Sequence, residues 1–486
     1  MLQRFLLLFC CFIVLGSILL GQSILIDQGV LWHIKSGELI YNNLAIPIFD
    51  PFLFWGENLF WLSDQWLSDL LLYLVISNGD VFAITLFTEL ILVSAFFVIP
   101  FFLSQKLTRN LLISIIVAFI CSINATIQWF CRPFIFAFLF FNLTYFILWL
   151  NYKSIKNNLP ISKLAYCLPL IFCLWANMHP SFILGFFLFV VFLGAEINYK
   201  NIIVSIGQNR IYIGIAILSF VATFINPYGY KLYIHIFELV TNSYFTSLFY
   251  EWQAVNFQNN LFIPFILTLF FIIINISYFR KSPLFSKPEF IIFLVLLLES
   301  LLHCRYIMFW IISLVIPLTR TFIALADNID FKAKSKSRIH NLIVRSMLVL
   351  TSLLIIKLYN NSEQNDKFSY PKNYPLQAIR HIEKLNIPNA KILNNMNWGG
   401  IVTYFLYPQR QAFIDDRASL IGEKMFKKYS AFYNLEPNWE DIFKEFGFDI
   451  ILLPPKIPAT TFLKETKYQN WVVSYEDEQA VVFVKN

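Results

Sequence analysis

Eleven apolar segments constrain what this chain of 486 residues can fold into. The first runs from Phe5 to Ile26. Ten more follow at approximately 81–103, 111–130, 134–151, 164–178, 181–198, 211–226, 261–279, 289–304, 306–325 and 341–359. A helix of about 20 apolar residues crosses the hydrocarbon of a bilayer. Only 14% of the residues are charged, whereas soluble domains carry about 25%. The sequence therefore predicts an α-helical polytopic membrane protein with about eleven transmembrane helices.

The basic residues fall mostly on one side of this predicted topology. If the N-terminus is cytoplasmic, only five of the Lys and Arg residues of 1–359 lie outside, namely Lys35, Arg132, Lys231, Arg305 and Lys357. The others lie in inner connections or inner span ends, as the positive-inside rule requires. Because the formal charge of +7 lies wholly in this module, orientation explains it and nucleic-acid binding is not predicted. We expect 1–359 to be a multi-pass module of a bacterial inner (plasma) membrane, with residues 5–26 as an uncleaved anchor.

Residues 360–486 have a different character, with as many acidic as basic side chains. Their periodicity predicts helices near 375–386, after Asn397, and near 422–433 and 438–446. It predicts strands at 390–393, 411–414, 448–453, 471–476 and 480–484. This alternation is typical of a small α/β domain. After an odd number of spans the domain is extracytoplasmic.

The first outer loop, 27–80, is amphipathic. Leu31, Ile34 and Ile40 are interspersed with charged side chains, which predicts helices that lie in the membrane interface and roof an active site. The loop also contains Trp32, Trp55, Trp61 and Trp66. The alternative interpretation is that these tryptophans are anchors at the level of the lipid headgroups.

Polar side chains gather on the outer face of the predicted bundle. Ionisable groups at membrane depth are costly and usually line a cavity or a pathway. The residues concerned are Asp27, His33, Asp50, Asp64, Arg132, His179, Asn226, Glu251, His303 and Arg305. Their shared face predicts one site there.

These residues lie in motifs that resemble a known family. The first outer loop contains DQGVLWHIKSGELI from Asp27, IPIFDPFLF from Ile46 and DQWLSDLLLY from Asp64. CRPFIF, LWANMHPSF, FINPYG, EWQ and HCRY follow from Cys131, Leu174, Phe224, Glu251 and His303. The tail adds NWGG from Asn397, FIDDR from Phe413 and YEDEQAVVFV from Tyr475. As an ordered set they resemble a bacterial family of multi-span proteins assigned to the GT-C superfamily of glycosyltransferases.

The resemblance implies a glycosyltransferase that takes a sugar from a polyprenyl-phosphate carrier on the outer membrane face. Its partners would be membrane lipids, this lipid-linked donor, and a glycan, lipid or protein acceptor. The chemistry would be inverting, with Asp27 in the position of the superfamily's catalytic first-loop acid. Arg132, Arg305, His179 and His303 are the candidates for binding the donor phosphate. His33, Asp50, Asp64, Asn226 and Glu251 are expected to support the site.

Several further expectations concern the tail and possible cofactors. The Asp415–Arg417 loop is interpreted either as an acceptor-side element or as a buried structural pair, and Trp398, Gly399 and Gly400 as a tight turn that opens a helix. Both segments are expected to face the membrane module. The family often has a second acidic residue two positions after the first, and here that position is Gly29. No metal-ligand spacing is apparent, and a requirement for a divalent cation stays open.

Three other functions are compatible with the sequence. One is a polymerase or ligase that moves a whole lipid-linked glycan. Another is a transporter or flippase of lipid-linked sugars, although transporters commonly show internal repeats and polar residues near the membrane midplane. The third is a non-catalytic factor in envelope assembly.

The topology gives the first prediction. A reporter that is active only outside the cytoplasm, fused after Asn486, is expected to be active, because eleven spans place the C-terminus opposite the N-terminus. The measurement is reporter activity in intact cells, with a fusion in the basic 332–338 connection as the cytoplasmic control. A cytoplasmic C-terminus would contradict both the topology and the shared outer face.

Overall fold

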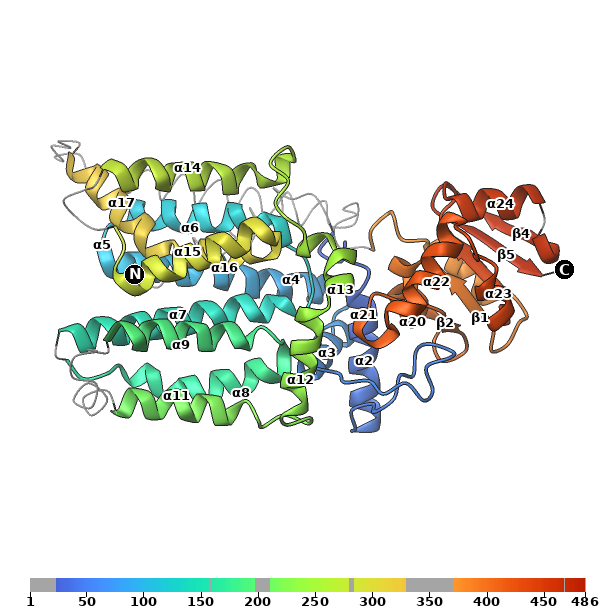
Figure 1. The fold of residues 1–486 in the computed structure, drawn as a ribbon, viewed down its shortest axis with the longest axis horizontal. Coiled ribbons are helices and arrows are strands. Elements are labelled where there is room, and N and C mark those ends of the chain that lie inside the picture. The colour runs from blue at the N-terminus through green and yellow to red at the C-terminus, as the bar shows by residue number, and fades with distance from the viewer. Residues whose placement is uncertain are drawn as a thin grey trace.

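The computed structural model describes residues 23–157, 159–196, 210–278, 284–328, 370–466 and 468–485. Figure 1 shows a bundle of roughly parallel helices joined at one end to a smaller domain that contains the sheet. Residues 5–22 of the first apolar run, the 332–338 linker and the 341–359 segment lie outside the described residues. The helices of the bundle and its outer loops are α2 (Val30–Asn43), α3 (Trp66–Ser77), α4 (Asp80–Val93), α5 (Ile99–Thr108), α6 (Leu111–Ala125), α7 (Phe134–Lys156), α8 (Leu168–Met178), α9 (Phe182–Glu196), α11 (Arg210–Ala222), α12 (Lys231–Thr241), α13 (Ser243–Leu248), α14 (Ile263–Tyr278), α15 (Lys287–Leu302), α16 (Ile307–Ser313) and α17 (Val315–Asn328).

Among the described residues, three helical stretches are long and apolar enough to cross a membrane: Asp80–Thr108, Leu111–Gln128 and Phe134–Lys156. These coincide with three of the predicted spans. Apolar helices of 10 to 17 residues occupy five other places, including Phe182–Ala195 and Asn260–Asn275. A membrane protein is therefore confirmed, while the number of eleven spans stays a prediction.

The surface of the bundle is apolar where a soluble protein would be polar. On α14, the side chains of Ile263, Leu267, Phe270 and Ile274 are all exposed. Their spacing of three or four residues places them on one face of the helix. A continuous exposed apolar face of this kind is typical of contact with lipid.

The predicted span at 306–325 is not one straight helix. The chain bends by 52° between Cys304–Ser313 and Val315–Ala326. Pro317 lies in the first turn of α17, a position that proline favours because its missing amide hydrogen would have no partner there. The apolar pattern of the sequence does not reveal this bend, because both halves are equally apolar.

The C-terminal domain contains a mixed five-stranded sheet in the order β2-β1-β3-β5-β4. Strand β1 pairs in parallel with β2 and β3, and β5 pairs antiparallel with β3 and β4. The expected helical membrane module with a small α/β tail is thus confirmed. The elements are β1 (Lys391–Asn394), β2 (Gln411–Ala412), β3 (Ile450–Leu453), β4 (Trp471–Glu476), β5 (Val481–Lys485), α19 (Leu376–Lys384), α20 (Gly399–Leu406), α21 (Ala418–Ile421), α22 (Glu423–Asn434), α23 (Asp441–Glu445) and α24 (Pro458–Thr466).

The first outer loop closes one edge of this sheet. Leu53 forms a parallel bridge with Ala412 of β2, and the amide of Phe54 donates to the carbonyl of Ala412. An open edge strand would expose unpaired amide and carbonyl groups. The loop between α2 and α3 is therefore in contact with the C-terminal domain, while the expectation that the loop's helices lie in the membrane interface stays a prediction.

The loop tryptophans have protein partners. Trp32 and Trp61 are buried, and the indole nitrogens of Trp55 and Trp66 donate to the carbonyl of Phe413 and to the side chain of Asn177. These contacts within the protein favour a structural role for the four tryptophans.

The NWGG motif opens a helix as expected, but the tight turn is the 3-10 turn Met396–Trp398 and does not include the glycines. Gly399 and Gly400 lie in the first turn of α20. A Cβ atom on Gly399 would collide with the backbone of the 414–415 segment, and one on Gly400 would come within 2.5 Å of the carbonyl oxygen of Gln28. Gly399 therefore allows α20 to pack against the 414–415 segment, and Gly400 allows it to approach the first outer loop closely.

A buried ion cluster joins the two domains. Arg417 Nη1 donates to Asp50 Oδ1 at 2.6 Å, and Arg417 Nη2 donates to Asp415 Oδ2 at 2.6 Å. The guanidinium also lies 4.8 Å from the ring centre of Trp61. Asp50 accepts in addition from the amides of Phe52 and Leu53. Asp50, Asp415 and Arg417 therefore fasten the outer loop to the C-terminal domain, which is the structural one of the two interpretations of the Asp415–Arg417 loop.

The cluster predicts that Arg417→Met strongly lowers the stability of the folded protein. Two buried carboxylates lose their counter-charge, and breaking a buried pair in this way costs about 3–5 kcal/mol. The purified protein is expected to melt at a lower temperature and to be cut faster by protease in the 44–63 loop. Lys444→Met, which removes an exposed pair with Asp441, is the control and should change neither. Equal melting temperatures for Arg417→Met and the wild type would contradict the role of the cluster.

Candidate active site

One cavity lies where the end of the bundle meets the C-terminal domain. Its volume is about 510 Å³, within the range of small-molecule sites. In Figure 1, α2 and α12 cross this end of the bundle, and both contribute to the wall. Residues 416–420 close it from the C-terminal domain. Its ionisable and polar lining consists of His33, Asp64, Gln65, Arg132, His179, Lys231, His235, Glu238, Glu251, Arg305, Asp416, Arg417 and Ser419.

Arg132 joins two carboxylates at the edge of this cavity. Its Nη2 atom lies 2.9 Å from Asp27 Oδ1 and also donates to Asp416 Oδ2. Asp27 Oδ1 accepts a further hydrogen bond from the amide of Gly29 at 2.9 Å. Burial raises the pKa of Asp27; Arg132 counteracts this rise, and Asp416 adds to it. Asp27 is therefore a carboxylate with an elevated proton affinity beside the cavity wall.

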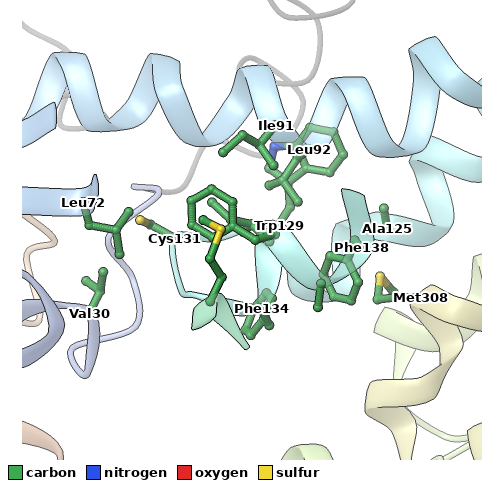
Figure 2. Packing of buried hydrophobic residues seen from close by; sticks show 14 of the residues in the cluster. Val30, Leu72, Ile91, Leu92, Ala125, Trp129, Cys131, Phe134, Phe138 and Met308 are labelled. Carbon is green, nitrogen blue, oxygen red and sulfur yellow. The ribbon is translucent and has the colours of Figure 1, made fainter. Parts of the chain in front are cut away.

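The position of Arg132 is set by its buried neighbours. The amide of Cys131 donates to the carbonyl of Ile24 at 2.9 Å, which ties the turn before α7 to the segment before Asp27. Figure 2 shows Cys131 on the side of the cluster where Val30 of α2 and Leu72 of α3 lie. The two acidic partners raise the pKa of Arg132, so its guanidinium stays charged.

Arg305, which also lines the cavity, is held in a similar way. Its Nη1 atom lies 3.1 Å from Glu251 Oε1, and its guanidinium stacks 4.4 Å from the ring centre of Trp252. His303 is not part of the cavity wall. Its Nδ1 lies 2.6 Å from the carbonyl oxygen of Trp252, so it donates there and positions the loop that carries Glu251.

Two of the histidines that line the cavity, His33 and His179, have different hydrogen-bond partners. His33 Nδ1 lies 2.7 Å from Asp69 Oδ1. His179 Nδ1 accepts from the amide of Ser181 at 3.1 Å, so its ring proton lies on Nε2. Burial lowers the pKa of His179, and the neutral ring offers a phosphate a hydrogen bond but no charge.

The remaining predicted residues divide between the cavity and its supports. Asp64 lines the cavity, and burial raises its pKa. Asn226 lies outside it and forms a local turn, since its Oδ1 accepts from the amide of Tyr228 and its Nδ2 donates to the carbonyl of Thr223. Trp398, Gly399, Gly400, Asp50 and Asp415 do not line the cavity either.

The site contains residues to which the sequence analysis gave no role of their own. Asp415 points inward to Arg417, while the next residue, Asp416, points to the cavity. Consecutive side chains of an extended segment lie on opposite sides. A pairing of Asp415 with Arg417 on one side therefore indicates that Asp416 points to the other side. Lys231, His235 and Glu238 are spaced as one face of α12, and this helical spacing could also have been recognised.

Among the described residues, no group of three or more His, Cys, Asp and Glu side chains is arranged to hold a metal ion. Two of the carboxylates that line the cavity, Asp416 and Glu251, instead have arginine partners.

The fold is shared with solved structures of low sequence identity. AglB, an oligosaccharyltransferase from Archaeoglobus fulgidus in complex with an inhibitory peptide and a dolichol-phosphate, covers 98% of this chain and 74% of its own, with 12% identity and a TM-score of 0.57. The same oligosaccharyltransferase tethered to an acceptor peptide covers 91% of this chain and 68% of its own, with 13% identity and a TM-score of 0.56. ArnT from Cupriavidus metallidurans, bound to undecaprenyl phosphate, covers 98% and 97%, with 11% identity and a TM-score of 0.53.

AglB and ArnT both belong to the GT-C superfamily. The expected GT-C-like fold is therefore confirmed. No protein-family model matches the sequence, and no curated protein is significantly similar to it.

Proposed function

We propose that this chain, which has the fold of AglB and ArnT, is a glycosyltransferase that uses a polyprenyl-phosphate sugar as its donor. The observation that carries the proposal is the cavity itself. It brings Arg132 and Arg305 together at the outer-loop end of an apolar helix bundle, and Asp27, whose pKa is raised by burial, is bonded to Arg132 beside it. A lipid-linked phosphate could thus meet positive charge while its chain stays in the membrane.

Asp27 is proposed as the general base. The acceptor hydroxyl oxygen attacks the anomeric carbon, its proton passes to Asp27, and the bond between that carbon and the phosphate oxygen breaks with the electron pair going to the phosphate. Attack from the face opposite the phosphate inverts the anomeric centre. A base is most effective when its pKa is near the working pH, and burial moves Asp27 in that direction.

Arg132 and Arg305 are proposed to stabilise the departing phosphate. Arginine suits this task because its planar fork forms two parallel hydrogen bonds to phosphate oxygens. Stacking on Trp252 fixes the plane of the Arg305 fork. The Nε2–H of His179 supplies a neutral donor to the same group.

The acceptor is proposed to enter between α12 and the C-terminal domain. A second cavity of about 400 Å³ lies there, and it shares His235, Glu238, Leu239 and Ser419 with the main one. The shared lining includes a carboxylate, an imidazole and a hydroxyl, which can hydrogen-bond a sugar or another hydroxylated acceptor.

The first test is Asp27→Asn. The change is nearly isosteric but removes the base, so transfer is expected to fall about 10²–10⁴-fold while undecaprenyl phosphate still binds. In the wild type, transfer should decline on the acid side with an apparent pKa above the ordinary aspartate value of about 3.9, because the base must be ionised. The assay follows radiolabel from a panel of polyprenyl-phosphate sugars into glycan, using membranes with and without the protein.

Asp64→Asn is the matched control, because Asp64 is the other described aspartate of this site that burial gives a raised pKa. It is expected to retain more activity than Asp27→Asn. If Asp64→Asn abolishes transfer and Asp27→Asn does not, the assignment of the base is wrong. If the wild type moves no sugar from any donor of the panel, the proposed function itself is wrong.

The second test is Arg305→Lys. Lysine keeps the charge but loses the fork and the stacking on Trp252. The KM for the lipid-linked donor is expected to rise about tenfold, the cost of roughly one charge-assisted hydrogen bond. The melting temperature should change little. An unchanged donor KM would show that Arg305 does not contact the phosphate.

A further inference from the structure

Asp416 belongs to the C-terminal domain, yet both of its carboxylate oxygens bond to the membrane module. Oδ2 accepts from Arg132 Nη2, and Oδ1 accepts from the indole nitrogen of Trp32 at 2.6 Å. The side chain is 15% exposed, and it lines the main cavity. It is therefore fixed at both oxygens beside the proposed site.

Asp27 approaches the same nitrogen of Arg132 from the other side, at 2.9 Å. A single Nη2 thus stands between the proposed base and a carboxylate that is 389 positions later in the sequence. Since one guanidinium nitrogen serves both acids, neither pairs with it exclusively.

The local backbone has room for this contact because residue 29 is glycine. Gly29 has an ordinary right-handed helical conformation, so the backbone does not require glycine. A Cβ atom there would collide with the Asp416 carboxylate and would lie 2.5 Å from Arg132 Nη2. The space beside Asp27 is therefore shaped to admit a carboxylate from the C-terminal domain.

We propose that Asp416 is a positioning residue of the catalytic site, which holds Arg132 between itself and Asp27, so that the C-terminal domain completes the site. This inference rests on the proposed function. The fastening of the domains does not require Asp416, because the cluster of Asp50, Asp415 and Arg417 already joins them.

The proposal has an electrostatic consequence with a definite sign. Asp27 faces Arg132, Asp416 and Glu251, and Glu251 is itself paired with Arg305. On its own loop, Asp416 adjoins Asp415 and Arg417. If Asp416 loses its charge, Arg132 pairs with Asp27 alone and the nearby repulsion disappears. Both changes favour the ionised form of Asp27, so its pKa falls and it becomes a weaker base.

The experiment compares Asp416→Asn with the wild type in two measurements. In the first, the acid limb of the pH–rate profile is expected to move to lower pH by about one unit, the smaller end of the shift that one neighbouring charge produces, and kcat is expected to fall. In the second, the protonated-carboxyl infrared band of Asp27, assigned by its loss in Asp27→Asn, should titrate at lower pH. Asp416→Glu is expected to restore part of both values.

Two further variants separate positioning from folding. Gly29→Ala keeps every charge but crowds Asp416 and Arg132, so the Asp27 band should titrate at a different pH from that in the wild type, and an unshifted band would contradict the role of this contact. Asp441→Asn makes the same chemical change on the surface of the C-terminal domain and should leave rate, band and melting temperature unchanged.

The outcomes are distinguishable. A lower melting temperature with an unshifted Asp27 band in Asp416→Asn would overturn the proposal and leave Asp416 a structural residue only. An unshifted band with normal stability overturns it as well. If the wild type transfers no sugar but the band shifts as expected, the proposed function fails while the coupling of Asp416 to Asp27 stands.

Discussion

The arrangement of the outer face depends on one guanidinium. Arg132 bonds to Asp27 before α2 and to Asp416 after β2, and its own turn is tied to Ile24 through the amide of Cys131. Three distant parts of the chain thus meet at a single charge. Because charges are costly to bury without partners, each of these three groups makes the positions of the other two favourable.

Neighbouring acids in the FIDDR motif have separate tasks. Asp415 points inward, and it and Asp50 both form ion pairs with Arg417. The guanidinium of Arg417 also contacts the rings of Trp32, Phe52 and Trp61. Asp416 turns to the cavity. The rigid ion cluster therefore lies one residue from a carboxylate at the proposed site, and it limits how far that carboxylate can move. A residue of the ion cluster, Asp415, and a residue of the proposed site, Asp416, are thus neighbours on the same loop.

The sequence predicted local features well and distant ones poorly. The helices Leu111–Gln128 and Phe134–Lys156 and strand β4 follow from apolar periodicity, which acts over a few residues. The pairing of Arg132 with Asp416 joins positions 284 residues apart, and no local pattern contains it. The roles of Gly29, Gly399 and Gly400 depend on what packs against them. Helix α24 was missed because its Pro- and Thr-rich sequence is a weak helix signal.

The order of the chain has a consequence for biosynthesis. Asp27 and Arg132 are synthesised before the loop that carries Asp416 and Arg417. Until the C-terminal domain has folded and docked on the outer loop, the cavity is open along one side and one of its carboxylates is missing. A nascent or partly inserted protein would therefore lack part of the proposed active site. Docking of the C-terminal domain would complete that site.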